Sequence, residues 1–200
     1  MQRVWFITNP GSGSSTEQKC AALLALLDEQ GVTLVGRTSF PADDLPAPAM
    51  LDAVGVDTAV LFAGDGTINA AICALATWEG AILLLPGGTM NLLAKTLHGD
   101  ADPAAIIHAA KDATTRIALP YVKAGEHRAF VGVIIGPAAS WVHAREMIRA
   151  GKIRGLKRAI GHAWAKTFGS GLRMTGAPGL PRSAQAVFIT PEPDGLSLAA

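Results

Sequence analysis

Four short apolar runs alternate with helical patterns in the first half of this 200-residue chain, and this alternation limits the fold more than any other feature. The apolar runs, each of a length typical of a buried strand, cover residues 3–8, 32–40, 58–62 and 81–85. The helical patterns cover residues 16–30, 49–54, 67–78, 91–97 and 103–112. Strands that alternate with helices form an open parallel sheet with helices on both faces. We therefore predict an α/β domain over residues 1–112.

The pattern changes near residue 113. Short runs typical of strands cover residues 114–119, 121–123, 127–135, 172–175 and 184–190, and helical patterns cover residues 138–150 and 153–168. The chain ends in a turn and the start of one more strand. We therefore predict a β-rich, sandwich-type second domain over residues 113–200, with a basic helical insertion, and we expect it to be incomplete and truncated at Ala200.

The composition is that of a folded α/β protein without a membrane span. Hydrophobic residues make up 50% of the chain, enough for a full core, and no apolar run approaches the ~20 residues of a membrane helix. Cys20 and Cys73 lie in apolar helical patterns, so we expect buried free thiols in a reducing cytoplasm. The five histidines have no metal-ligand spacing, and we assign them no catalytic role.

Three glycine-rich loops follow the first, third and fourth predicted strands. Their sequences are Asn9-Pro10-Gly11-Ser12-Gly13-Ser14, Gly64-Asp65-Gly66-Thr67 and Pro86-Gly87-Gly88-Thr89-Met90-Asn91. In an open parallel sheet, ligands bind beyond the carboxyl ends of the strands, where all three loops are expected to meet. The first loop is not a Walker loop, because no Gly-Lys-Ser/Thr follows, and alone it would be an ordinary strand-to-helix turn.

The second loop is the most specific of the three. Gly64 and Gly66 can adopt positive φ and let a ligand approach the main chain, while Thr67 can cap the following helix. The free N–H groups at a helix start favour anions. Asp65 between the glycines suits a metal ion that accompanies phosphate. The three loops together predict a nucleotide-phosphate site.

The order of these motifs resembles the diacylglycerol kinase catalytic-domain family, which includes bacterial lipid kinases and sphingosine and ceramide kinases. The shared patterns are Asn-Pro-x-x-Gly, Gly-Asp-Gly-Thr-x-Asn and Pro-x-Gly-Thr-x-Asn, placed after the first, third and fourth strands. The resemblance is strong over residues 3–98 and weaker over 113–190. It implies an ATP-dependent lipid kinase that uses Mg²⁺ and transfers the γ-phosphoryl group to a lipid hydroxyl such as that of diacylglycerol.

The resemblance also implies residue roles. Asp65 would act as the catalytic carboxylate, either through Mg²⁺ or on the acceptor hydroxyl. The nucleotide would be bound by Asn9, Pro10, Gly11, Ser12, Gly13, Ser14, Gly64, Gly66, Thr67, Gly88, Thr89 and Asn91. Such a site fits phosphoryl transfer, which needs positioning and charge neutralisation more than covalent chemistry.

The chain departs from the family pattern at two positions. Ala63 replaces the first glycine of Gly-Gly-Asp-Gly-Thr, and Leu92 replaces an aspartate that usually follows the third motif. Two alternatives therefore stay open: an NAD kinase-like phosphotransferase, and a non-catalytic nucleotide- or lipid-binding member of the family. The third motif favours the lipid kinases over the first alternative.

Charge is divided unevenly along the chain. Residues 1–112 hold five Lys/Arg and twelve Asp/Glu, a balance of −7, whereas residues 113–200 hold twelve and four, a balance of +8. Within residues 153–168, the basic side chains Arg154, Lys157 and Arg158 share one stripe, and Trp164 belongs to a separate apolar stripe. Such a helix suits an anionic membrane surface, although a helix packed on a sheet with a solvated charged face is the alternative. We expect a cytoplasmic, peripherally membrane-associated protein that binds no nucleic acid; a homodimer and a monomer both stay open.

Overall fold

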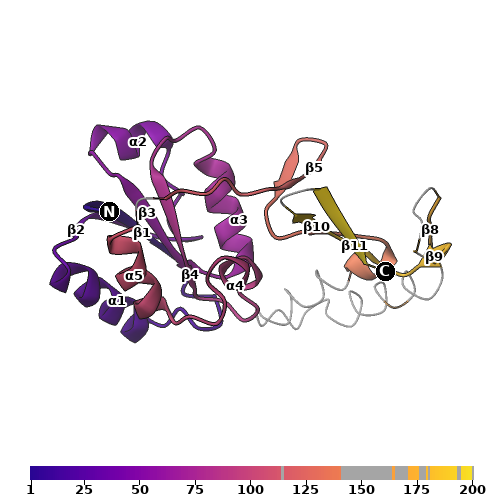
Figure 1. The fold of residues 1–200 in the computed structure, drawn as a ribbon, viewed down its shortest axis with the longest axis horizontal. Helices are drawn as coiled ribbons and strands as arrows, with labels where there is room; N and C mark the ends of the chain where they lie inside the picture. The colour runs from indigo at the N-terminus through magenta and orange to yellow at the C-terminus, as the bar shows by residue number, and fades with distance from the viewer. Residues whose placement is uncertain are drawn as a thin grey trace. The chain divides into compact units, whose positions relative to one another are not determined.

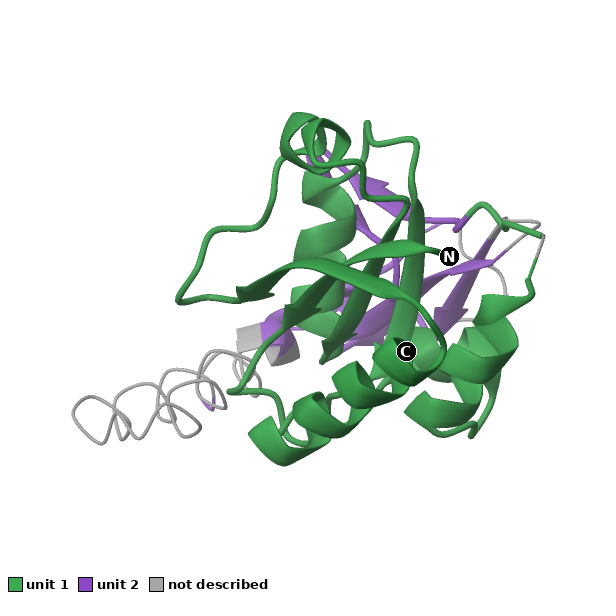
Figure 2. Cartoon of the chain, turned by 90° about the vertical axis from the view of Figure 1, so that its left-hand side faces the viewer, with its two compact units in different colours: residues 1–118 green, residues 119–200 purple. Residues whose placement is uncertain are grey.

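The chain divides into two compact units, Met1–Ala118 and Leu119–Ala200, coloured separately in Figure 2. The computed structural model describes residues 1–113, 115–140, 164, 171–175, 179, 181–192 and 195–199. Among the described residues, no helix is both long enough and apolar enough to cross a membrane.

The first unit is built on a four-stranded parallel sheet. Its strands are β1 (Arg3–Thr8), β2 (Thr33–Ser39), β3 (Thr58–Ala63) and β4 (Ala81–Pro86). They lie in the order β2-β1-β3-β4 and all run in the same direction (Figure 1). This arrangement confirms the open parallel sheet predicted from the alternation of strands and helices.

Five helices cover both faces of this sheet, as predicted. They are α1 (Glu17–Glu29), α2 (Pro48–Ala53), α3 (Asp65–Ala74), α4 (Leu92–His98) and α5 (Pro103–Lys111). Figures 1 and 2 show α1 and α5 on one face and α2 and α3 on the other. The sides follow from right-handed crossovers, because the chain moves from β1 to β2 in one direction and from β2 through β3 to β4 in the other.

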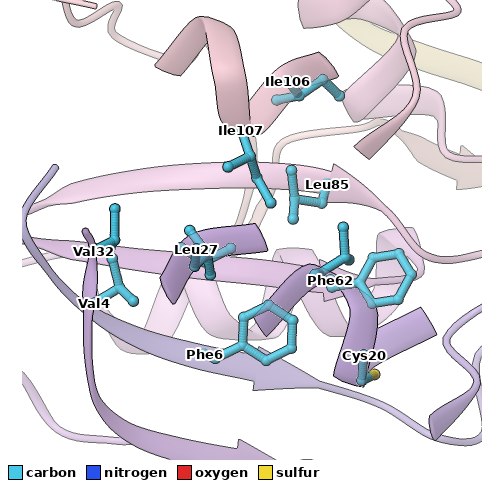
Figure 3. Packing of buried hydrophobic residues seen from close by; sticks show 11 residues of the cluster. Val4, Phe6, Cys20, Leu27, Val32, Phe62, Leu85, Ile106 and Ile107 are labelled. Atoms are coloured by element: carbon cyan, nitrogen blue, oxygen red, sulfur yellow. The ribbon is translucent and has the colours of Figure 1, made fainter. Parts of the chain in front are cut away.

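The core under α1 and α5 is formed by alternate residues of the central strands. Successive side chains of a strand point to opposite faces, so β1 and β3 present every second residue to these helices. Figure 3 shows this cluster, whose buried members are Val4, Phe6, Cys20, Leu23, Leu27, Val32, Val60, Phe62, Leu85, Ile106 and Ile107. The intervening residues Trp5 and Ile7 are also buried, which is why β1 is apolar from Val4 to Ile7.

Both cysteines are free of disulfides, as predicted. Cys20 is buried in the core, and burial raises the pKa of its thiol. Cys73 on α3 is half-buried rather than fully buried.

Helix α3 begins earlier and ends earlier than the sequence pattern predicts. Its N-cap is Gly64, in an extended conformation, so Thr67 lies inside the first turn and is not the cap. The predicted positive φ is also wrong for Gly64, whose φ is −83°, and Gly66 has no positive φ either. The apolar spacing continues past the helix end at Ala74 because Trp78 remains buried and its Nε1 donates to Asp52.

The second unit is β-rich, with short antiparallel strands. β5 (Val122–Ala124) and β6 (His127–Ala129) form a hairpin around Gly125, whose φ is +61°. A three-stranded sheet joins β7 (Val133–Ile135), β10 (Val187–Glu192) and β11 (Gly195–Ala199). The remaining described elements are β8 (Leu172–Arg173), paired with β9 (Ser183–Ala184), and the 3₁₀ turn η1 (Pro137–Ser140).

Four predictions for this half are wrong in detail. The strand predicted over residues 184–190 covers the end of β9, which pairs with β8, and the first part of β10, which pairs with β7. Residues 115–119 are irregular and not a strand. The single strand predicted over residues 127–135 is two strands, because β6 pairs with β5 whereas β7 pairs with β10. The predicted helix over residues 138–150 begins as the 3₁₀ turn, and its remainder lies outside the described residues, as does the helix predicted over 153–168 apart from Trp164.

Candidate nucleotide-phosphate site

The three glycine-rich loops meet at one edge of the parallel sheet. Thr8 at the end of β1 pairs with Phe62 of β3, and Ala63 at the end of β3 pairs with Pro86 at the end of β4. The three strands therefore end level with one another. The loops that follow them start side by side, as the sequence predicts for an open parallel sheet.

Asn9 connects the first loop to helix α3. Its side-chain oxygen accepts a hydrogen bond from the Gly11 amide at 2.8 Å, and its Nδ2 donates to the Thr67 hydroxyl at 2.8 Å. Thr67 is buried, and the hydrogen bond between Asn9 and Thr67 is partly shielded from solvent. Both ends of the Asn9 side chain are thus engaged within the protein, which fixes the loop relative to the first turn of α3.

Three serine hydroxyls fasten the first loop to the other two. Ser12 Oγ accepts from the Gly64 amide at 3.1 Å, and Ser14 Oγ donates to the Gly88 carbonyl at 2.9 Å. Ser15 Oγ lies 2.8 Å from the Gly87 carbonyl oxygen and 3.1 Å from that of Phe62. The hydroxyls of Ser12 and Ser14, predicted to face the nucleotide, therefore hold the loops together.

Ser15 is the residue that the sequence pattern missed. It precedes α1 but does not cap that helix, because Thr16 is the N-cap and accepts from the Lys19 amide at 3.3 Å. Ser15 is 2% exposed, and its hydroxyl is the innermost link among the three loops. A serine in a run of small polar residues carries no signal of such burial, so only the structure identifies it.

Gly87 and Gly88 allow the third loop to approach the second closely. A Cβ on Gly88 would lie 2.5 Å from the Gly64 Cα, and a Cβ on Gly87 would lie 2.6 Å from the Ala63 amide nitrogen. Neither distance leaves room for a methyl group. Gly13 is also restricted, because its Cβ would lie 2.7 Å from the Thr89 hydroxyl oxygen.

Gly66 differs from these glycines because neither the packing around it nor its backbone conformation requires a glycine. No atom lies within 4 Å of the position that its Cβ would take, and its φ is not in the positive range. It lies in the first turn of α3, where alanine would be favoured over glycine. The missing side chain leaves open space directly over the start of the helix.

The first three amides of α3, which include that of Gly66, have no hydrogen-bond partner within residues 1–113. Helix geometry leaves the N–H groups of Asp65, Gly66 and Thr67 without an intrahelical acceptor, and Gly64 supplies no side-chain cap. No hydrogen bond within residues 1–113 uses these three donors. Unpaired amides at the positive end of a ten-residue helix form a suitable site for a phosphate group.

Asp65 lies beside these amides and is half-buried. Its Oδ2 accepts from the Leu92 amide and its Oδ1 from the Leu93 amide, each at 3.2 Å. Each carboxylate oxygen keeps further acceptor capacity beyond these two bonds. The described residues contain no group of three or more His, Cys, Asp or Glu able to hold a metal ion. Asp65 therefore fits Mg²⁺ only in the mode in which one carboxylate, water and substrate phosphates share the ion.

The third loop ends in an unusual conformation. Asn91 has φ +52° and is the one non-glycine residue with positive φ among those the structure describes. Its side chain bonds back to Gly88, accepting from the amide at 2.6 Å and donating to the carbonyl at 3.1 Å. Thr89 and Met90 are exposed at the tip of the loop. Of the residues predicted to contact a membrane, Arg154, Lys157 and Arg158 lie outside the described residues, and Trp164 is 59% exposed.

The family model for the diacylglycerol kinase catalytic domain matches residues 3–121, which include the whole sheet and all three loops. The chain belongs to the diacylglycerol kinase catalytic-domain family. The family is that of a kinase catalytic domain. A comparison with curated protein sequences finds no match.

Three solved structures have a similar fold. Two candidate diacylglycerol kinases from Bacillus anthracis str. Sterne superpose with TM-scores of 0.60 and 0.59 at 19% and 20% identity; each alignment covers 94% of this chain and 64% and 65% of theirs. A further diacylglycerol kinase structure from the same organism gives a TM-score of 0.52 at 22% identity, covering 72% of this chain and 50% of that one. The chain thus spans between half and about two thirds of the proteins that it matches, and the likeness concerns the fold.

Proposed function

We propose that the protein transfers the γ-phosphoryl group of ATP to the hydroxyl of a lipid such as diacylglycerol. The observation that carries this proposal is the set of unpaired amides of Asp65, Gly66 and Thr67 beneath the open space at Gly66. A phosphate chain could approach the backbone there without displacing any side chain. The proposal takes the nucleotide and the kind of acceptor from the family.

Each part of the site would have a defined role in this reaction. The α3 amides would bind the phosphates, and the loops held by Asn9 and the serines would keep those amides fixed before ATP arrives. Asp65 would hold Mg²⁺ together with the phosphates, and the ion would neutralise charge on the transferring group. No Lys or Arg occurs in the three loops, so the helix start and the metal would supply the positive charge.

The acceptor step is a displacement at the γ-phosphorus. The lipid hydroxyl oxygen bonds to phosphorus, the bond to the bridging oxygen of ADP breaks, and the hydroxyl proton passes to a base. Asp65 is the one carboxylate in the three loops and is our candidate for that role if it does not hold the metal. Association with anionic membranes through Arg154, Lys157 and Arg158 would bring the protein to its substrate.

Radiolabelled ATP tests the proposal directly. The protein is incubated with γ-labelled ATP, Mg²⁺, NAD and mixed vesicles that contain diacylglycerol, and the lipids are separated from the aqueous phase. We expect label in a phosphorylated lipid and a loss of more than about a hundredfold in rate for Asp65→Ala. Label recovered only in phosphorylated NAD, or ATP binding with no transfer to any lipid, would contradict the proposal.

A further inference from the structure

Helix α4 begins without a cap of its own. The preceding residue, Asn91, is in the left-handed region (φ +52°, ψ +40°) and makes no side-chain bond to the helix. Its side chain is instead committed to the amide and carbonyl of Gly88. The first amides of α4 therefore need an acceptor from elsewhere in the chain.

The acceptor is Asp65, the first residue of α3. Its two carboxylate oxygens each take one amide of α4, from Leu92 and from Leu93, 27 and 28 residues away along the chain. A carboxylate at this place satisfies two unpaired donors and interacts favourably with the positive end of the helix. Asp65 thus does for α4 what an N-cap side chain normally does from within the helix.

A second contact joins the same two loops. The backbone at Gly88 lies so close to Gly64 that a Cβ on Gly88 would fall 2.5 Å from the Gly64 Cα. The starts of α3 and α4 are therefore fastened at two points, one formed by packing and one by hydrogen bonds. Thr89 and Asn91, which are expected to close the nucleotide pocket, lie between these two points in the sequence.

We infer that Asp65 is a positioning residue for the loop between β4 and α4, in addition to any role with the metal ion. Its carboxylate fixes the start of α4 before a ligand is present, and so places Thr89 and Asn91 against the first turn of α3. The relevance of this placement for catalysis rests on the proposed function, whereas the placement itself does not.

Two substitutions of Asp65 separate positioning from charge. Asp65→Ala removes both acceptors and the charge, whereas Asp65→Asn removes the charge but keeps one oxygen that can accept an amide. Asp102→Ala is the matched control, because Asp102 caps α5 of the same unit by accepting from the Ala105 amide at 2.8 Å. All variants are made in the full chain.

The first measurement is hydrogen exchange of individual amides by NMR on the ligand-free protein. We expect Asp65→Ala to accelerate exchange at Leu92 and Leu93 by about tenfold or more, and Asp65→Asn to do so less. Asp102→Ala should accelerate exchange at Ala105 and leave α4 unchanged. Unchanged exchange at Leu92 and Leu93 in Asp65→Ala would overturn the inference. If that variant does not fold, unchanged exchange at both amides in Asp65→Asn has the same meaning.

The second measurement is ATP affinity in the presence of a chelator, without Mg²⁺. Both Asp65 variants lack the charge and neither can use a metal, so a difference between them reports the position of the loop. We expect Asp65→Ala to bind ATP several-fold more weakly than Asp65→Asn. Equal affinities would contradict the inference even if both variants have lost activity. If the wild-type protein itself neither binds ATP nor phosphorylates lipid, the proposed function fails while the exchange result still decides the positioning role.

Discussion

Gly87 and Gly88 lack side chains because the second and third loops touch at their backbones. Gly31 is glycine for another reason, since it follows α1 with φ +74°. Gly66 fits neither explanation, because its backbone is ordinary and its surroundings are open. A glycine that neither the backbone conformation nor the packing of the chain requires therefore indicates a ligand that needs the space.

Gly88→Ala should destabilise the protein and distort the site. The added methyl group meets the Gly64 backbone at 2.5 Å, and backbone gives way less easily than a flexible side chain. We expect a loss of about 1–3 kcal/mol in the free energy of unfolding, typical of overpacking. Chemical denaturation followed by circular dichroism measures it, and a variant as stable as wild type would show that the two loops do not pack as described.

The residue types of the candidate site could be predicted from the sequence, but their partners could not. Asn9, Ser12 and Ser14 have the right groups to bind phosphate, and that role stays a prediction. The structure shows those same groups bonded to Thr67, Gly64 and Gly88, because neighbouring loops of a parallel sheet must also be held together. Hydrogen-bond partners that lie more than fifty residues apart depend on strand order and register, which local spacing does not contain.

At the scale of whole elements, Asp57 links the starts of β1 and β3 by hydrogen bonds. Its carboxylate accepts from the amides of Gln2 and Arg3 at 2.8 and 2.9 Å and from the Thr58 hydroxyl at 2.6 Å. Burial raises the pKa of Asp57, but the hydrogen bonds from Thr58, Arg3 and Gln2 outweigh burial and hold the pKa below its ordinary value. The charged form is therefore the one that stabilises the fold.

Asp57→Asn should lower the free energy of unfolding at neutral pH and reduce the loss of stability that acid causes. Because the folded-state pKa is lowered, the contribution of Asp57 is complete above the unfolded-state pKa of about 4 and is lost as the pH falls through the folded-state value. We expect a loss of about 1 kcal/mol at pH 7, since the group is partly exposed, and convergence with wild type in acid. Unfolding curves across this pH range measure the effect.

Asp44→Asn is the control, because Asp44 is exposed and has no hydrogen bond among residues 1–113. An Asp57→Asn variant that is as stable as this control at pH 7 would refute the role of Asp57.

The helices and strands of the first unit could be predicted because most of them are long enough to show the spacing of apolar residues that is typical of their type. The end of α3 was predicted too late because Leu75 and Trp78 continue its apolar spacing from a turn. In the second unit, strands of two or three residues are too short to show a period. The break between β6 and β7 depends on which strand each one pairs with, which the apolar run over residues 127–135 does not reveal.

At the scale of the whole molecule, the sequence separates charge, with −7 in residues 1–112 and +8 in residues 113–200. If the basic part binds anionic membranes, replacing Arg154, Lys157 and Arg158 by Glu should weaken binding to phosphatidylserine vesicles by about a hundredfold or more. Added salt should weaken wild-type binding in the same assay.

Vesicle sedimentation provides the comparison for this prediction. The control replaces three exposed basic residues of the first unit, Lys19, Arg37 and Lys111, by Glu, so that the change in net charge is the same. We expect this control to bind vesicles far better than the variant of residues 154, 157 and 158. Equal loss in both would show that net charge, and no local basic surface, governs the interaction.

The central claim is that the first turn of α3 binds the phosphates of ATP in the space left by Gly66. Gly66→Ala tests it most directly, with ATP affinity and the free energy of unfolding measured on the same sample. Alanine suits this helical position and meets no atom of the chain, so we predict unchanged stability, or a gain of up to about 1 kcal/mol, together with about tenfold or greater loss of ATP affinity. Gly31→Ala should show the opposite, with lower stability and unchanged ATP affinity, because its φ is positive and it lies at the far end of α1. A Gly66→Ala protein that binds ATP as tightly as wild type would contradict the account.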